Sequence, residues 1–212
     1  MSLREQAYES FTEQLLTRRI SLGQFVSQRE LVKLTGMPLG AIREMIPRLE
    51  VDGLIRTVPN RGLQIIQVDI ELIRNAFQLR LVLEREAVHN FVGIASEEMV
   101  EDLRRRHLET REEAQAGVTA ELLARAQQMD WDMHDLMIDA LGNELISSIY
   151  RTNSIKIRLI RNEDTRMLPE LVVSVMDEHL RFIDALASRD VEAAEAALAA
   201  HLESAKRRAV RI

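Results

Sequence analysis

The sequence has no cysteine, few aromatic residues and no long apolar run. Among its 212 residues, Phe, Trp and Tyr together make up 4%, and cysteine is absent. Neither a disulfide framework nor a thiolate metal site can therefore form. No apolar run approaches the ~20 residues of a membrane span, and the first residues lack the apolar core of a signal peptide. These absences predict a cytoplasmic protein with no membrane contact.

The residues that are present favour helices packed on helices, and the length allows two domains. Hydrophobic residues make up 46% and charged residues 29%, which is an ordinary globular balance. The net charge of -6 is unevenly divided: residues 1–68 carry 9 Lys and Arg against 7 Asp and Glu, whereas the remainder carries 19 against 27. Because DNA phosphates attract positive charge, we expect any nucleic-acid contact in the N-terminal part.

The first 68 residues have the element order of a winged helix-turn-helix, with three helices and a two-stranded wing. Apolar residues recur at helical spacing over 3–16, and a capping-box pair begins a short helix over 27–34. A further helix is predicted over 38–53. Two strands, over 54–58 and 63–68, flank a Pro-Asn-Arg-Gly turn. In this fold one helix enters the DNA major groove and the hairpin touches the flanking backbone.

This segment resembles the GntR family of bacterial transcription regulators. The resemblance rests on GMPLGAIREMIPRLEVDGLI at 36–55 and TVPNRG at 57–62, which match the family's recognition helix and wing in order and spacing. It implies that DNA is contacted by three arginines and the turn of the wing: Arg29, Arg43, Asn60, Arg61 and Gly62. Gly62 would let the wing backbone approach the duplex. Taken singly, each arginine has the simpler interpretation of a solvated surface charge.

Two departures from the family pattern lie in the recognition helix. Pro38, Leu39 and Gly40 stand where many members have Ser-Arg-Thr, so the arginine most often expected to contact a base edge is missing. Pro47 lies inside the helix, where a proline costs about 3 kcal/mol unless the helix kinks. Despite these departures, the pattern of the whole segment predicts DNA binding.

From residue 69 onward the sequence predicts an all-α antiparallel bundle of about six helices, which makes the whole chain mainly α. The predicted breaks between helices fall near residues 96, 116–117, 142–143, 162–169 and 188–190. A short junction at 68–69 separates the two predicted domains, a DNA-binding domain over 1–68 and an effector- and metal-binding domain over 69–212.

Three histidines and one aspartate interrupt apolar helical stripes and should face the bundle interior. Asp130 and His134 are four residues apart, so they project from one helix face about 40° apart. His179 and His201 are symmetric about residue 190, the break between the last two helices, so an antiparallel hairpin brings them to the same height. Three imidazoles and one carboxylate form a site for a divalent transition metal. Zinc suits this set best, with nickel and manganese as alternatives.

The simpler interpretation of any one of these histidines is a core residue with satisfied hydrogen bonds, but four convergent groups favour the metal site. Of the remaining histidines, His107 stands among charged neighbours and is predicted to lie on the surface.

This half of the chain resembles the FCD ligand-binding domain of the FadR-type branch of the same family. The matching segments are RLVLE at 80–84, DWDMH at 130–134, LGNELI at 141–146, DEHL at 177–180 and AAHL at 199–202. The metal-binding subset of this branch carries Asp and three His at these places, and its metal helps to hold a small carboxylate effector. Met133 departs from the phenylalanine that usually precedes the first of these histidines.

Arg80 also lies on an apolar stripe and should face inward, where a buried arginine needs an anionic partner. It could bind an effector carboxylate whose other end reaches the metal. An internal ion pair with Glu84 or another acidic residue is the structural alternative, and the sequence leaves the choice open.

The resulting prediction is a ligand-responsive transcription regulator and not an enzyme. Resemblance to the family implies a repressor controlled by a small organic acid. A homodimer is expected, because two recognition helices related by a two-fold axis contact a palindromic DNA operator. Two alternatives remain: a metal-dependent enzyme built on a helical bundle, for which no general base is evident, and a regulator whose bundle binds acyl chains or a partner protein without metal.

Overall fold

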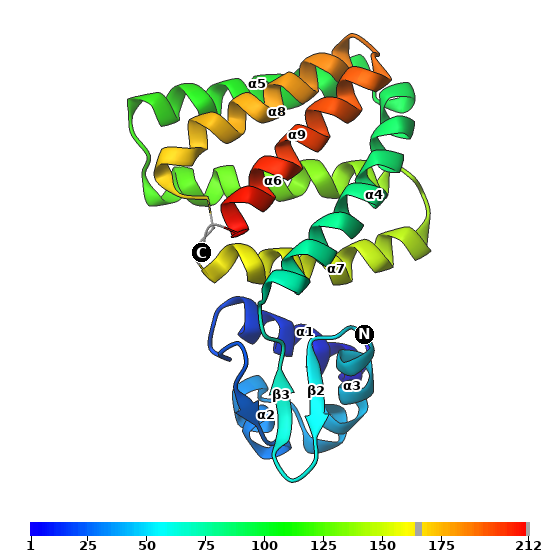
Figure 1. Cartoon of the computed structure of the whole chain (residues 1–212), viewed down its shortest axis with the longest axis vertical. Coiled ribbons are helices and arrows are strands. Elements are labelled where there is room, and N and C mark those ends of the chain that lie inside the picture. Colours follow the sequence, from blue (N-terminus) through cyan, green and yellow to red (C-terminus); the bar gives the residue numbers. More distant parts are fainter. Residues whose placement is uncertain (164–166, 211–212) are drawn as a thin grey trace.

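A computed structural model of the chain describes the backbone of residues 1–163 and 167–210 and the side chains of 1–160 and 167–210. It divides into a small N-terminal lobe and a larger helical lobe (Figure 1). The small lobe contains α1 (Leu3–Leu16), β1 (Phe25–Val26), α2 (Gln28–Thr35), α3 (Leu39–Val51), β2 (Ile55–Val58) and β3 (Gly62–Ile65). The large lobe contains α4 (Ile70–Ile94), α5 (Glu97–Ala116), α6 (Ala120–Asp139), α7 (Glu144–Glu163), a 3₁₀ turn (Pro169–Leu171), α8 (Val172–Ala187) and α9 (Val191–Val210). The predicted fold, a winged helix-turn-helix followed by a helical bundle, is confirmed.

Capping boxes fix the starts of α1 and α2. The hydroxyl of Ser27 accepts a hydrogen bond from the backbone N–H of Glu30 at 3.2 Å, and the Glu30 carboxylate accepts one from the N–H of Ser27 at 2.6 Å. Ser2 and Glu5 make the same pair of bonds at the start of α1. These bonds satisfy N–H groups that have no partner within the helix. The apolar faces of the three helices then meet the sheet in one core, which includes Phe11, Leu15, Leu31, Ile42, Met45, Leu49, Leu54 and Ile65.

The sheet has three antiparallel strands in the order β1-β3-β2, so the prediction of a two-stranded wing was incomplete. β1 is only two residues long, and no periodicity can be recognised over that length. Its pairing with β3 explains Gly62. This residue has φ +93°, and a Cβ there would lie 2.9 Å from the carbonyl oxygen of Val26. Glycine is required at this position by the fold itself.

In the large lobe, the described residues form six α-helices, as predicted. Asp69, Ser96 and Thr119 cap α4, α5 and α6, since each side chain accepts a hydrogen bond from the N–H three residues further on. α5 packs along α8, α8 packs against α9, and α4 contacts α6, α7 and α9. The break predicted at 162–169 falls partly on residues 164–166, which lie outside the described residues.

α7, a helix of the large lobe, also contacts the small lobe. Its Leu159 is 2% exposed and belongs to the core of the small lobe, against which Ile155 also packs. The ammonium group of Lys156 lies beside Gly53, just after the end of α3. Among the helices in the described part of the chain, none is long and apolar enough to cross a membrane.

Candidate metal centre

Four polar side chains meet in the interior of the large lobe. Asp130 and His134 come from α6, His179 from α8 and His201 from α9, and each is at most 3% exposed. One oxygen or nitrogen atom from each lies within 4.8 Å of the others. The i,i+4 spacing on α6 and the hairpin of α8 and α9 thus bring together the four residues that the sequence singled out.

The atoms of this cluster have the spacing of metal ligands. Oδ1 of Asp130 lies 3.2 Å from Nε2 of His179, 3.6 Å from Nε2 of His201 and 3.9 Å from Nε2 of His134. The Nε2 atoms of His134 and His201 are 3.3 Å apart. Two ligands that each lie about 2.1 Å from one ion are roughly 3.0–3.4 Å apart at right-angled to tetrahedral geometry. The separations of 3.2 and 3.3 Å lie in this range, and those of 3.6 and 3.9 Å exceed it by 0.2 and 0.5 Å, so the four donor atoms are close enough together for one transition-metal ion to bind them after small side-chain shifts.

Two carboxylates set the orientation of two of the imidazoles. Nδ1 of His134 donates to Oε2 of Glu84 at 2.8 Å, and Nδ1 of His201 donates to Oε2 of Glu178 at 2.8 Å. An ionised carboxylate only accepts, so the proton of each neutral ring is on Nδ1 and the lone pair is on Nε2. Burial lowers the pKa of both histidines, which favours these neutral forms. Both lone pairs are therefore directed at the centre, as metal ligation requires.

Behind His134 lies a buried network that contains Arg80. Oε1 of Glu84 accepts hydrogen bonds from Nε of Arg80 at 2.6 Å and from the Tyr150 hydroxyl at 2.8 Å. Burial alone would raise the pKa of Glu84, but the charge of Arg80 and the contact with His134 hold it at about 2. Arg80 faces inward as the sequence predicted, and it forms the internal pair with Glu84 that was the structural alternative.

The prediction that His107 lies on the surface is wrong. Its side chain on α5 is fully buried, its Nδ1 donates to the carbonyl of Leu103 at 2.7 Å, and its ring centre lies 5.2 Å from that of His179. The charged residues beside it in sequence point away from the core. A usable signal was present, since the buried residues of α5 recur at helical spacing: Val100, Leu103, His107, Thr110 and Ala114. Glu84, Glu178 and Tyr150 were also not predicted as parts of the site.

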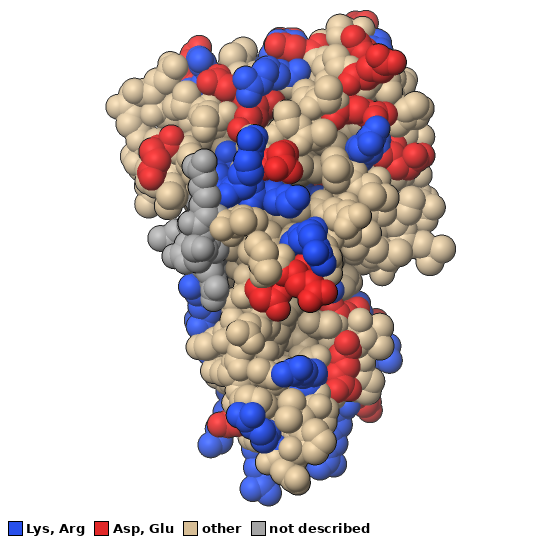
Figure 2. All heavy atoms as spheres, viewed as in Figure 1, with Lys and Arg blue, Asp and Glu red and all other residues tan. Residues whose placement is uncertain are grey.

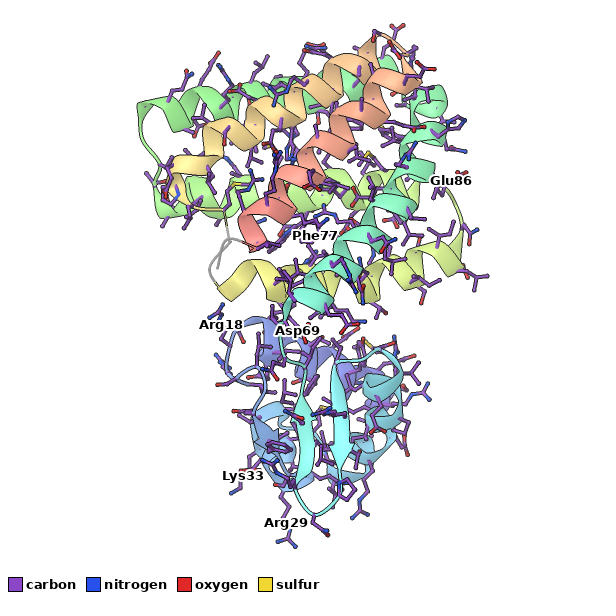
Figure 3. All side chains as sticks on the ribbon, in the orientation of Figure 1. Arg18, Arg29, Lys33, Asp69, Phe77 and Glu86 are labelled. Atoms are coloured by element: carbon purple, nitrogen blue, oxygen red, sulfur yellow. The ribbon has the colours of Figure 1, made fainter. Side chains whose placement is uncertain are left out.

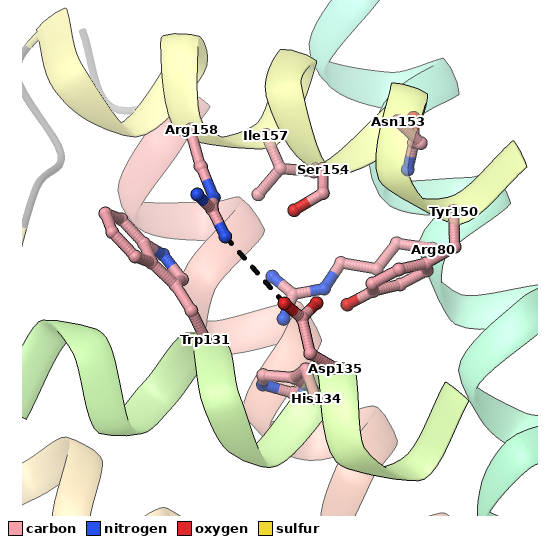
Figure 4. Close-up of a pocket in the computed structure, with 9 residues that line it drawn as sticks. All are labelled: Arg80, Trp131, His134, Asp135, Tyr150, Asn153, Ser154, Ile157 and Arg158. Carbon is pink, nitrogen blue, oxygen red and sulfur yellow. Dashed lines mark ion pairs between the residues drawn. The ribbon is translucent and has the colours of Figure 1, made fainter. Parts of the chain in front are cut away.

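A small pocket lies beside the cluster, between α4, α6 and α7 (Figure 4). It is lined by Arg80, Trp131, His134, Asp135, Tyr150, Asn153, Ser154, Ile157 and Arg158. The guanidinium of Arg158 lies 4.2 Å from the centre of the Trp131 ring. Nε1 of Trp131 and Nε of Arg158 are buried and have no hydrogen-bond partner among the described residues. The pocket has a volume of about 10 Å³, which is room for one water molecule.

The residues assigned to DNA contact lie together at the far end of the small lobe. A groove is lined by Arg29 from α2, Arg43 from α3 and Gly62 from β3, among others. Arg43 donates to the side chain of Gln28 at 3.2 Å, and Arg61 lies 3.9 Å over the ring of Phe25. Asn60 has φ +61°, which suits the turn of the wing. Arg29 points outward at this end of the molecule (Figure 3), where Figure 2 shows several Lys and Arg side chains at the surface.

Comparisons with known proteins match both lobes. The family model of the FCD domain matches residues 75–204, a range that includes the four clustered residues. The chain is 23% identical over 200 residues to YdhC, an uncharacterised HTH-type transcriptional regulator of Bacillus subtilis, across 92% of this chain and 86% of YdhC. A GntR transcriptional regulator from Rhodococcus sp. RHA1 superposes with a TM-score of 0.71 at 19% identity, covering 98% of each chain. The Zn²⁺-bound FCD domain of TM0439 gives a TM-score of 0.51 at 28% identity, covering 68% of this chain and 95% of that domain.

Proposed function

Because this chain belongs to the FCD-type branch of the GntR family of transcription regulators, we propose that a small organic acid controls its DNA binding through a divalent metal ion. Residues 1–68 bind the operator, and residues 69–212 bind the metal and the acid. The protein acts as a homodimeric repressor on a palindromic operator, and the acid releases it. Its relatives are transcription regulators, so the alternative of a metal-dependent enzyme is set aside.

The observation that carries the metal proposal is the approach of two lone pairs. Nε2 of His134 and Nε2 of His201 face each other at 3.3 Å, beside the Asp130 carboxylate. Two acceptors at this distance repel each other unless a cation lies between them. Zinc suits three imidazoles and one carboxylate best, with nickel and manganese as alternatives, and likeness to the Zn²⁺-bound TM0439 domain supports zinc. When bound, the ion would supply positive charge and a coordination position for a carboxylate.

The pocket beside the cluster supports a carboxylate as the effector. It contains His134 of the metal site together with two arginines, Arg80 and Arg158. The unpartnered N–H groups of Trp131 and Arg158 are hydrogen-bond donors that an acceptor oxygen would satisfy. Because the pocket has room for about one water molecule, a larger acid would displace lining side chains, and we propose that it displaces the stacked Trp131 and Arg158. Since Arg158 is on α7, such a movement acts on the helix that also contacts the small lobe.

Metal content tests the first half of this proposal. We expect the dialysed wild-type protein to keep one zinc ion per chain after zinc loading, and both His179→Ala and His201→Ala to lose most of it. The control is His89→Ala, because the His89 side chain is 65% exposed and lies outside the cluster. Elemental analysis gives the stoichiometry. Unchanged zinc in both variants would remove the coordination hypothesis and favour the metal-free alternative.

A mobility-shift experiment tests the second half. Zinc-loaded protein at low salt should shift the DNA upstream of its own coding sequence, and Arg43→Ala should weaken the shift. One member of a panel of small organic acids should release the DNA. Absence of a shift on any neighbouring intergenic DNA would contradict operator binding, whatever the metal content is.

A further inference from the structure

The buried imidazole of His107 is a polar group in the centre of the large lobe that the proposed function leaves unexplained. It comes from α5, which contributes no residue to the four-residue cluster, and it meets the edge of the His179 ring at an interplanar angle of 71°. Nδ1 of His107 donates to the carbonyl of Leu103, so Nε2 of the neutral ring carries a lone pair. This Nε2 is buried and has no hydrogen-bond partner within the described part of the chain.

His179, the neighbouring ring, also has a nitrogen without a hydrogen-bond partner in the part that the structure describes. Nδ1 of His179 is also buried without a hydrogen-bond partner among the residues described. The other two histidines of the cluster donate from Nδ1 to Glu84 and Glu178, whereas no described carboxylate accepts from Nδ1 of His179. Metal-bound histidines almost always donate their second N–H to an acceptor that fixes the ring. His179 would therefore need an acceptor of its own.

We infer that His107 is that acceptor and acts as a positioning residue for the metal ligand His179. Nδ1–H of His179 donates to Nε2 of His107, and the chain of bonds ends at the carbonyl of Leu103. A linear N–H···N bond of about 2.9 Å separates two imidazole centres by roughly 5 Å, which the ring separation of 5.2 Å satisfies.

The two tautomers of His179 differ in how well they suit His107. If Nε2 of His179 carried the proton and donated to Oδ1 of Asp130 at 3.2 Å, its Nδ1 would be a second acceptor facing the acceptor of His107. Both nitrogens would then lack a donor in a buried setting, which is costly. If Nε2 instead directs its lone pair at a cation, Nδ1 carries the proton that His107 lacks. His107 therefore favours the tautomer of His179 that ligates a metal.

This inference rests on the proposed metal site, and metal affinity tests it separately. His107→Phe keeps a planar ring of similar size without an acceptor, and His107→Gln keeps an acceptor oxygen. The matched control is His89→Phe on the exposed face of α4. Zinc affinity is measured by competition with a chromophoric chelator. Urea unfolding of the chelator-treated variants shows whether the fold is retained.

We expect His107→Phe to bind zinc about 10- to 100-fold more weakly than the wild type, as is typical when an outer-shell partner is lost. His107→Gln should recover much of this loss, and His89→Phe should match the wild type. If His107→Phe is folded and binds zinc as tightly as the wild type does, the inference is overturned, but the proposed function is unaffected. A wild-type protein that binds no zinc or other divalent metal would overturn both.

A measurement on the wild type covers the case in which the variants do not fold. In ¹⁵N-labelled, zinc-loaded protein, imidazole nitrogen shifts identify which nitrogen of each histidine is protonated. We expect a proton on Nδ1 of both His179 and His107, and a scalar coupling across the hydrogen bond between Nδ1 of His179 and Nε2 of His107. A proton on Nε2 of His107, or the absence of this coupling, would overturn the inference.

Discussion

Arg80 and Glu84 are a charged pair that the interior of the large lobe encloses almost completely. Their side chains are 4% and 0% exposed, and the carboxylate also accepts from His134 and Tyr150. Removing one partner of a buried pair leaves an uncompensated charge and typically costs about 3–5 kcal/mol. We expect Arg80→Met to lower the free energy of unfolding of chelator-treated protein by that amount, measured with urea.

The control for this prediction lies on the same helix. Arg85 pairs with Glu195 at 2.8 Å, but its side chain is 58% exposed. Water screens such a pair, so Arg85→Met should cost about 1 kcal/mol or less. Equal losses in the two variants would mean that Arg80 contributes through packing alone, and that the charge on Glu84 is not what stabilises this network.

Some residues of the candidate metal site could be predicted from the sequence, and others could not. Asp130 and His134 could be paired because four residues of helix place two side chains on one face. Glu178 was not predicted to belong to the site, because it is next to His179 in sequence and so points away from it; its carboxylate accepts a hydrogen bond from His201 on the adjacent α9 instead. That contact depends on the rotation of α8 against α9, and a one-dimensional pattern does not fix such a rotation.

At the scale of elements, the helices were predictable and the shortest strand was not. The bounds of α1, Leu3–Leu16, agree with the apolar periodicity, and the predicted capping box of Ser27 and Glu30 correctly indicated where α2 begins. β1 consists of two residues whose strand conformation depends on pairing with β3, through Phe25 with Gln64 and Val26 with Leu63. Long-range pairing overrides local propensity there.

Pro47 makes α3 less stable than the same helix would be with an ordinary residue at this position. It lies inside the helix at an exposed position, where it offers no N–H to the carbonyl four residues earlier. Pro47→Ala should raise the free energy of unfolding by about 1–3 kcal/mol, seen as a higher melting temperature. Glu44→Ala, at another exposed position of α3, should change it by about 0.5 kcal/mol at most. A lower melting temperature for Pro47→Ala would indicate a bend in α3 that proline favours.

α7 is the element through which the pocket and the small lobe can influence each other. Ser154 and Arg158 line the pocket, while Lys156 lies beside Gly53 after the recognition helix. Burial lowers the pKa of Lys156, which fits its position between the lobes. We expect Lys156→Met to bind zinc and acid as the wild type does, but to show a smaller change in DNA affinity when acid is added.

Fluorescence anisotropy with labelled operator DNA measures this change, using the organic acid that most raises the melting temperature of zinc-loaded protein. Glu144→Gln, at an exposed position in the first turn of α7, is the control. If Lys156→Met responds to the acid as strongly as the control does, the coupling does not depend on this contact.

At the scale of the whole molecule, the proposed control requires that the two lobes influence each other equally in both directions. If the acid weakens operator binding by a given factor, operator DNA must weaken acid binding by the same factor, because both report one coupling free energy. Typical couplings of 1–3 kcal/mol correspond to factors of about 5–150.

Titration calorimetry of the acid with and without operator, and anisotropy of the operator with and without acid, give the two factors at one salt concentration. In His201→Ala, which lacks a ligand of the proposed metal site, both factors should approach one. Unequal factors in the wild type would mean that the acid acts outside this equilibrium, for example on the assembly of subunits. If His201→Ala shows the same two factors as the wild type, the acid acts without the metal ion, and the effector binds elsewhere in the bundle.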